Sequence, residues 1–176
     1  TGGAVLNLGS RIPVNASGAI DLLTLNGGDG DDSFTITAGH GIAAIDVAGG
    51  NVSAADRVTL NGDAGVTNAE VNLGTATPSV SGAGLGTINL TGIELATVNN
   101  GVGAIDINGT AGDDRFVVSQ TGANTAEVQV NGLSPLVTTN NSTALTIDVG
   151  AASGNDLVTI NGTAGNDVFT TVSDSS

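Results

Sequence analysis

The chain has 176 residues, and its 17 Asp and Glu residues against three Lys and Arg give a formal net charge of −14. So few cations cannot neutralise a row of phosphates, so we expect no nucleic-acid partner. The chain contains no Cys, which excludes disulfides, thiolate zinc sites and cysteine nucleophiles. No apolar run approaches the roughly 20 residues that span a bilayer, so we expect no membrane insertion.

Apolar residues, mostly Val, Ile and Leu, alternate with polar residues in short runs along the chain. The runs lie at residues 5–8, 34–36, 58–60, 71–73, 88–90, 128–130 and 158–160. A period of two with β-branched residues indicates strands with one buried face. Gly, Asn and Asp interrupt the runs about every ten residues, and helical periodicity is missing. The sequence therefore predicts an all-β protein with almost no α-helix.

Asn-Gly dipeptides mark the candidate turns. They begin at Asn26, Asn61, Asn100, Asn108, Asn131 and Asn161. Both residue types tolerate positive φ, so the dipeptides are typical of tight turns and hairpins. An antiparallel β-sandwich, in which hairpins connect the strands, is therefore one possible fold.

An internal repeat favours a different fold. The segment DLLTLNG at residues 21–27 recurs as DRVTLNG at 56–62 and as DLVTING at 156–162, with weaker copies from Glu94 and Glu127. The strand-ending Asn recurs at intervals of about 30–38 residues, a period that fits one turn of a solenoid. We therefore predict a parallel β-solenoid, β-helix-like or β-roll-like, of about five turns, with the antiparallel β-sandwich as the alternative.

The domain prediction follows from the repeat. Residues 1–176 are expected to form a single elongated β repeat domain. The chain begins with Thr1 and carries no secretory signal stretch, so we expect it to be part of a longer repetitive chain.

A second repeat overlaps the first and ends on phenylalanine. Residues 26–34, 108–116 and 161–169 hold Asn, Gly, Gly, Asp and Phe at identical offsets, and all three Phe residues of the chain occupy the last position. Chance placement would not put every aromatic residue in one position of a motif. We expect each Phe to fill the same kind of interior site just after the turn.

At these residues the sequence resembles the calcium-binding nonapeptide of repeats-in-toxin proteins, Gly-Gly-x-Gly-x-Asp-x-U-x, where U is a large apolar residue. Residues 27–35 match every position, whereas Thr110 and Thr163 replace the second Gly in the other copies. The resemblance implies a β-roll in which turn carbonyls and Asp carboxylates bind Ca²⁺ between stacked loops. The implied ligands are Asp32, Asp114 and Asp167 with Asp29, Asp31 and Asp113 beside them, and the pairs Asp21 with Asp32 and Asp156 with Asp167.

Ordinary turn chemistry explains the same acidic residues without a metal. Asp and Asn side chains bond to their own backbone and accept unusual φ values, so they are common in turns. The net charge favours calcium, because carboxylates aligned along one edge repel each other unless a hard cation screens them. Both interpretations remain open at the level of sequence.

The functional prediction combines these features. His40 is the only His, expected in an exposed loop, and the chain has no Lys for a Schiff base, so we do not expect an enzyme. Similar glycine- and aspartate-rich strings occur in large secreted bacterial surface proteins. We expect a non-catalytic, calcium-stabilised extracellular module of a cell-surface adhesin or matrix protein, whose carbohydrate or cell-surface ligand the sequence does not name.

The open ends of a solenoid suggest its partners. Uncapped strand edges invite further strands, so the expected partners are neighbouring repeats or identical subunits joined end to end. One alternative function is therefore a self-assembling subunit of an extracellular filament or surface layer. The other is a β-helix enzyme that cleaves polysaccharides, which the absence of Trp and Tyr disfavours.

Overall fold

The computed structural model describes residues 4–6, 14–16, 18–51, 55–63, 65–101, 103–150 and 154–170. The elements in this part of the chain are strands, which confirms the all-β prediction. None of its elements is a helix long and apolar enough to cross a membrane. The predictions for Thr1 and for residues 7 and 8 lie outside the described residues.

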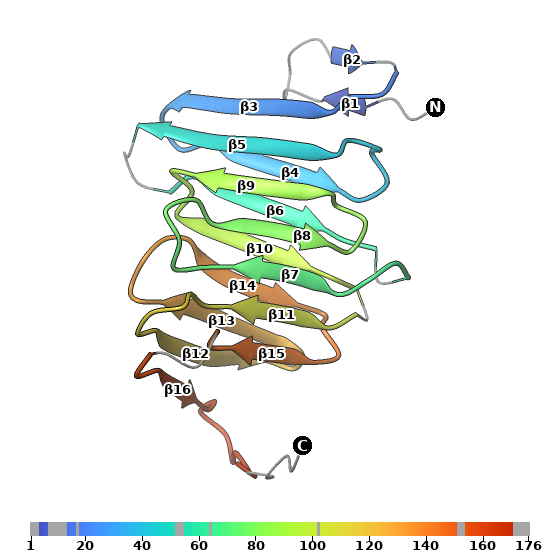
Figure 1. The fold of residues 1–176 in the computed structure, drawn as a ribbon. Helices are drawn as coiled ribbons and strands as arrows, with labels where there is room; N and C mark the ends of the chain where they lie inside the picture. Colours follow the sequence, from blue (N-terminus) through green and yellow to red (C-terminus); the bar gives the residue numbers. More distant parts are fainter. Residues whose placement is uncertain are drawn as a thin grey trace.

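Two seven-stranded sheets face each other across one core (Figure 1). Sheet I, in spatial order, contains β16 (Leu157–Asn161), β12 (Arg115–Gly122), β13 (Thr125–Val130), β14 (Leu136–Asn140), β10 (Leu95–Asn99), β6 (Arg57–Asn61) and β4 (Ser33–Thr37). Sheet II contains β15 (Leu145–Asp148), β11 (Ile105–Asn108), β7 (Ala69–Asn72), β8 (Ser79–Gly82), β9 (Thr87–Thr91), β5 (Ala44–Asn51) and β3 (Leu22–Asp29). The strands β1 (Ala4–Leu6) and β2 (Val14–Ala16) form a separate antiparallel pair.

Strand direction is mixed in both sheets. Most pairs are parallel, as in β4, β6 and β10, where Ser33, Arg57 and Leu95 are aligned. Antiparallel pairs are confined to one three-stranded meander in each sheet, β7–β8–β9 in sheet II and β12–β13–β14 in sheet I. Outside the meanders the chain crosses from one sheet to the other after each strand, for example from β3 to β4 to β5 to β6.

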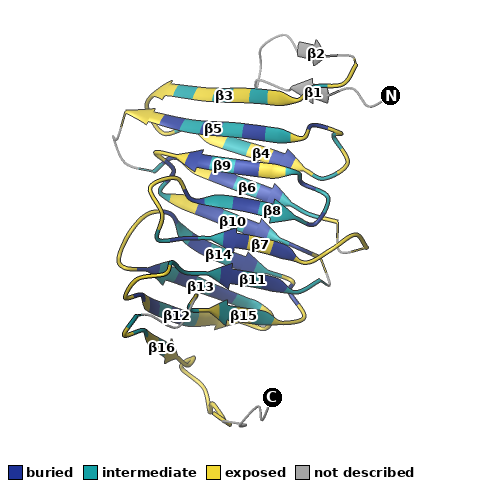
Figure 2. Ribbon diagram, viewed as in Figure 1, coloured by how far each residue is buried: buried dark blue, intermediate teal, exposed yellow. Residues whose placement is uncertain are grey.

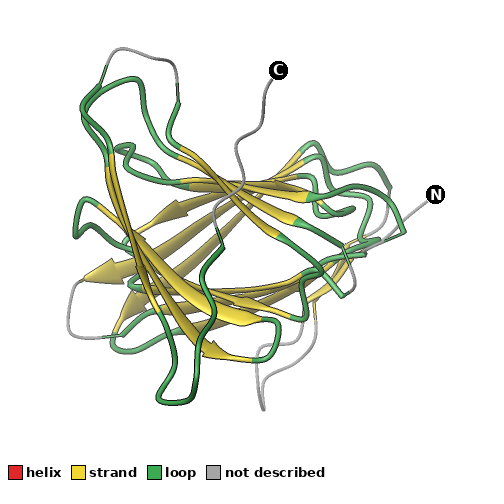
Figure 3. Cartoon of the chain, turned by 90° about the horizontal axis from the view of Figure 1, so that it is seen from below, coloured by secondary structure: helices red, strands yellow, loops and turns green. Residues whose placement is uncertain are grey.

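The predicted parallel solenoid of about five turns is therefore wrong, and the structure is a sandwich of two mixed sheets. The sandwich alternative is right about the two facing sheets, which Figure 3 shows along the direction in which the strands stack. The repeat misled the prediction because its copies do not share one sheet. The copy at residues 21–27 forms β3 of sheet II, whereas those at 56–62 and 156–162 form β6 and β16 of sheet I.

Burial follows the alternation of the strands. Val58 and Leu60 in β6 are buried with Thr59 only partly covered, and Ile105 and Ile107 in β11 are fully buried. Burial falls off at the end of the sandwich formed by β15 and β16 (Figure 2). The core therefore lies in the middle of the stack and is open at that end.

The three Phe residues do not share one environment. Phe116 in β12 is fully buried, and Phe34 in β4 is partly buried against the core. Phe169 is 65 % exposed in the segment that follows β16, where no strand is present among residues 162–170. The prediction of a common interior site is wrong for Phe169, because a motif can place a ring after a turn but only a neighbouring strand can cover it.

Only some of the Asn-Gly dipeptides contain a residue with positive φ. Asn131 and Gly132 have φ of 55° and 68° in the loop between β13 and β14, and Gly101 has 57°. The glycines that follow Asn26, Asn61, Asn108 and Asn161 lie outside the left-handed region. Those glycines are required for space rather than for backbone conformation, as the candidate site shows.

Candidate functional site

A row of carboxylates follows the edge of the sandwich where the chain enters sheet I. Asp32, Asp56 and Glu94 each occupy the residue before a strand, namely β4, β6 and β10, which are paired in parallel. Asp114 and Asp156 hold the same position before β12 and β16, which are also paired in parallel. We call these five residues the carboxylate ladder.

Carboxylates in the ladder cap the backbone of the neighbouring strand. Asp56 Oδ1 accepts a hydrogen bond of 2.6 Å from Asp32 N, and Glu94 Oε2 accepts one of 2.9 Å from Asp56 N. Asp156 Oδ1 accepts one of 2.9 Å from Asp114 N. A buried N–H without an acceptor costs about 1–3 kcal/mol, so each cap stabilises a corner of the chain.

Glycine makes room for the carboxylates. A Cβ placed on Gly109 would lie 2.6 Å from Asp114 Oδ2 and 2.9 Å from the Phe116 ring. The same relation joins Gly27 to Asp32, Gly49 to Asp56 and Gly162 to Asp167. The first Gly of the nonapeptide-like motif therefore lets the aspartate fold back across its own turn.

Asp114 is the most fully satisfied acid of the ladder. It is buried, and its Oδ2 accepts hydrogen bonds from Thr110 N at 2.6 Å and Thr110 Oγ1 at 3.0 Å. Its Oδ1 accepts a hydrogen bond of 2.8 Å from Asn131 Nδ2 in the next hairpin loop. Thr163 Oγ1 likewise donates to Asp167 at 3.0 Å. The threonines that depart from the nonapeptide pattern are thus hydroxyl donors to the aspartate.

Asp32 lacks such a donor. Gly28 stands where the other copies have threonine, and Asp32 Oδ2 is buried over Gly27 without a hydrogen-bond partner in the described part of the chain. By correspondence with Asp56, the remaining oxygen, Oδ1, is the atom that would cap a strand beyond β4. The copy that matches the nonapeptide at every position is therefore the one with an unsatisfied carboxylate.

The structure brings some of the predicted calcium ligands together. Asp113, Asp114 and Asp156 lie at one corner, where Asp113 Oδ1 also accepts a hydrogen bond of 2.9 Å from Asn155 N. Asp29 Oδ1 accepts a hydrogen bond of 2.6 Å from Asn51 Nδ2. Within the described ranges, however, no three acidic or His side chains are grouped so that they could hold a metal ion.

Other predicted ligand pairs are far apart. Asp21 precedes β3, and the Asp32 carboxylate lies over Gly27, six residues further along the chain, so about 20 Å of strand separates the two at 3.3 Å per residue. Asp156 precedes β16, whereas Asp167 lies in the segment after it. Asp31 is exposed in the corner after β3. A spacing of eleven residues thus spans a strand rather than closing a site.

Sequence reasoning missed Asp56, Glu94 and Asn131 as members of this edge. The signal was present for two of them, because the repeats beginning at Asp56 and Glu94 place an acid immediately before a strand. No such signal identified Asn131 as a hydrogen-bond donor to Asp114, since 17 residues of hairpin separate the two.

His40 differs from its prediction as an exposed loop residue. It is half-buried, and its Nδ1 accepts a hydrogen bond of 3.0 Å from Ile42 N. Burial lowers the pKa of His40, and the Leu85 carbonyl partly offsets the shift. The ring is engaged with the backbone through Nδ1, whereas its buried Nε2 has no hydrogen-bond partner among the described residues.

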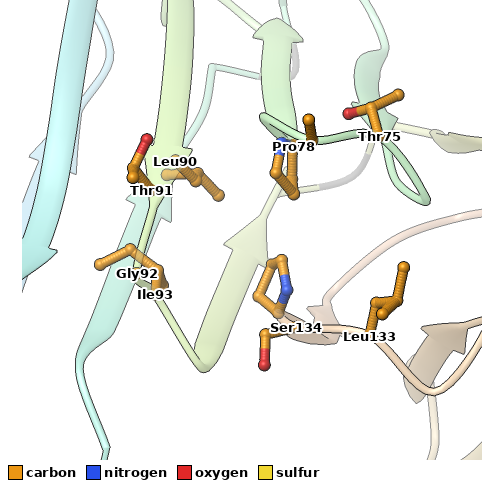
Figure 4. A pocket seen from close by; sticks show the side chains of 10 residues that line it. Thr75, Pro78, Leu90, Thr91, Gly92, Ile93, Leu133 and Ser134 are labelled. Atoms are coloured by element: carbon orange, nitrogen blue, oxygen red, sulfur yellow. The ribbon is translucent and has the colours of Figure 1, made fainter. Parts of the chain in front are cut away.

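Two hollows on the described part of the surface lack charged and aromatic groups. One of about 320 Å³ is lined by residues such as Pro78, Leu90, Ile93 and Ser134 (Figure 4). Another of about 330 Å³ is lined by Gly101 and by Asn, Ser and Thr residues of two loops. Neither of these two is lined by an acidic, basic or aromatic residue, and both are at the small end of ligand pockets.

Comparison with known proteins adds no family. No protein-family model, curated protein or solved structure matches the chain. The resemblance to repeats-in-toxin proteins thus rests on the nonapeptide alone.

Proposed function

We propose that the chain is a non-catalytic structural module of an extracellular adhesin or matrix protein, which joins further β-strands at the ends of its two sheets. One observation carries the proposal: the core-facing side chains of β16 are uncovered. Val158 and Ile160 are aligned with the buried Phe116 and Val118, yet they are 40 % and 55 % exposed. An edge strand with an exposed apolar face is a template for another strand.

The rest of the molecule supports a structural role. Side-chain hydrogen bonds join neighbouring strands in addition to the backbone pairing. Asn99 Nδ2 donates to Asn61 Oδ1 at 2.8 Å, and Asn89 Nδ2 donates to Asp46 Oδ1 at 2.8 Å. His40 binds the backbone, and the two hollows offer no charged group. The extracellular location rests on the resemblance of the motif alone.

The proposal predicts self-association that depends on the open end. The weight-average mass from sedimentation is expected to rise with concentration for the wild-type chain, because subunits bury the exposed apolar residues of β16. Ile160→Lys should shift this rise to at least tenfold higher concentration, since it places a charge in the joint. Thr87→Lys, on an exposed site in the middle of sheet II, is the matched control and should behave as the wild type. A wild-type chain that stays monomeric at every concentration contradicts the proposal.

We also propose, from the resemblance to the nonapeptide, that calcium stabilises the module, and this part has its own test. At a calcium concentration one hundred times the dissociation constant, a site confined to the folded state adds about 2.7 kcal/mol to the free energy of unfolding. Thermal melts with calcium and with chelator should therefore differ in midpoint. Superimposed melts would remove calcium from the proposal and leave the structural role in place.

A further inference from the structure

The two ends of the sandwich have matching strand directions. In sheet I, β4, β6, β10 and β14 are parallel, β13 is antiparallel to both of its neighbours, and β12 and β16 therefore run in the same direction as β4. In sheet II, β3 and β15 are related in the same way. A second copy translated along the stack thus matches β16 with β4, and β15 with β3, in strand direction. The β1–β2 pair lies beyond β3 at that end (Figure 1), so the β4 edge is the one considered for a junction.

The carboxylate ladder is left incomplete in complementary ways at the two ends. At one end, the Asp32 carboxylate accepts no hydrogen bond from the described residues, and its Oδ2 is buried. At the other, the Asp156 N–H has no acceptor in the described part of the structure, although Asp32 N and Asp114 N are both capped. Each cap inside the molecule runs from the N–H of one strand to the carboxylate of the next strand toward β16. An Asp32 placed beyond β16 would continue that order.

We propose that a second copy of this chain docks head to tail, with its β4 beside β16 of the first copy and its Asp32 capping the N–H of Asp156. This rests on the proposed function. The cap fixes the register, because each internal cap is accompanied by a backbone hydrogen bond from the first residue of the next strand. Leu157 N donates to Asp114 O at 2.8 Å, and Arg57 N donates to Asp32 O at 2.9 Å. In the junction Ser33 N donates to Asp156 O, and Ser33 is aligned with Leu157.

The junction also completes the core. In this register Phe34 of the second copy is aligned with Val158, and Ile36 with Ile160, so the exposed side chains of β16 meet the inner face of β4. A head-to-tail contact uses two different surfaces of each copy and is not closed by two-fold symmetry, so it produces an open fibre. The occupant is therefore another copy of the chain rather than a small ligand.

Cross-linking tests the register, and the absence of native Cys leaves no competing thiol. Parallel neighbours lie about 4.8 Å apart, which a disulfide spans, whereas a shift of two residues separates them by about 8 Å, beyond its reach. Ser33→Cys with Leu157→Cys should give covalent multimers on mild oxidation, and Ser33→Cys with Thr159→Cys should give several-fold fewer. Neither Ser33→Cys nor Leu157→Cys alone should cross-link.

The cap is tested by Asp32→Ala, with Asp31→Ala as the exposed neighbouring control. Loss of a charge-assisted hydrogen bond should weaken association about tenfold for Asp32→Ala, with circular dichroism showing that both variants are folded. A wild-type chain that never associates overturns both the junction and the proposed function. Association with cross-links in another register, cross-linking of either single variant, or no effect of Asp32→Ala overturns the junction alone.

Discussion

Phe116→Ala is expected to lower the free energy of unfolding by about 3–5 kcal/mol, because the ring is fully buried between the sheets and its removal leaves a cavity. Phe169→Ala removes the same side chain from the same motif position, but the ring is 65 % exposed. Its effect should stay within about 0.5 kcal/mol. Urea denaturation of the two variants measures the difference.

The pair of variants separates the motif from its environment. Equal losses for Phe116→Ala and Phe169→Ala would contradict the structure, because they would place both rings in equivalent sites. Phe34→Ala should fall between the two, since Phe34 is partly buried against the core at the edge of sheet I.

Asp114→Ala is expected to cost about 2–4 kcal/mol, because it leaves the Thr110 N–H, the Thr110 hydroxyl and the Asn131 amide without their acceptor. Asp113→Ala is the matched control. Asp113 is exposed and accepts one hydrogen bond, from Asn155 N, so its loss should cost less than about 1 kcal/mol. Denaturant unfolding in calcium and in chelator measures both variants.

Comparing the loss of stability in calcium with the loss in chelator shows how the Asp114 carboxylate stabilises the fold. A loss of the same size in calcium and in chelator identifies the residue as part of the turn. A loss that disappears in chelator would instead show that Asp114 stabilises the fold through a bound cation, against the hydrogen bonds described for it.

The strands were predictable because burial on one face leaves a period of two in the sequence. Val58 and Leu60 show it in β6, and Ile105 and Ile107 show it in β11. Strand direction leaves no such mark, since side chains alternate in the same way in parallel and antiparallel pairs. The short strand β8 (Ser79–Gly82) alternates like its neighbours, so its reversal could not be read from the sequence.

The sequence could predict which acidic residues lie at the turns before strands, but not which residues they contact. The nonapeptide singled out Asp114 and the spacing of eleven residues singled out Asp156, and the fold places these two residues side by side. The partners of each acid depend on which strands are adjacent, and that information comes from the topology. Asp21 was included on spacing alone, and β3 separates it from Asp32.

The meanders have a consequence for how the molecule can change length. Each meander adds two strands to a single sheet and returns the chain to its original direction, in sheet II through β8 and in sheet I through β13. A hairpin inserted in one sheet alone would leave the opposite layer two strands short. Because the insertions are balanced, both layers have seven strands and finish level. If one hairpin is gained or lost in each sheet together, such a module can therefore become longer or shorter while the strands at its two ends keep their direction.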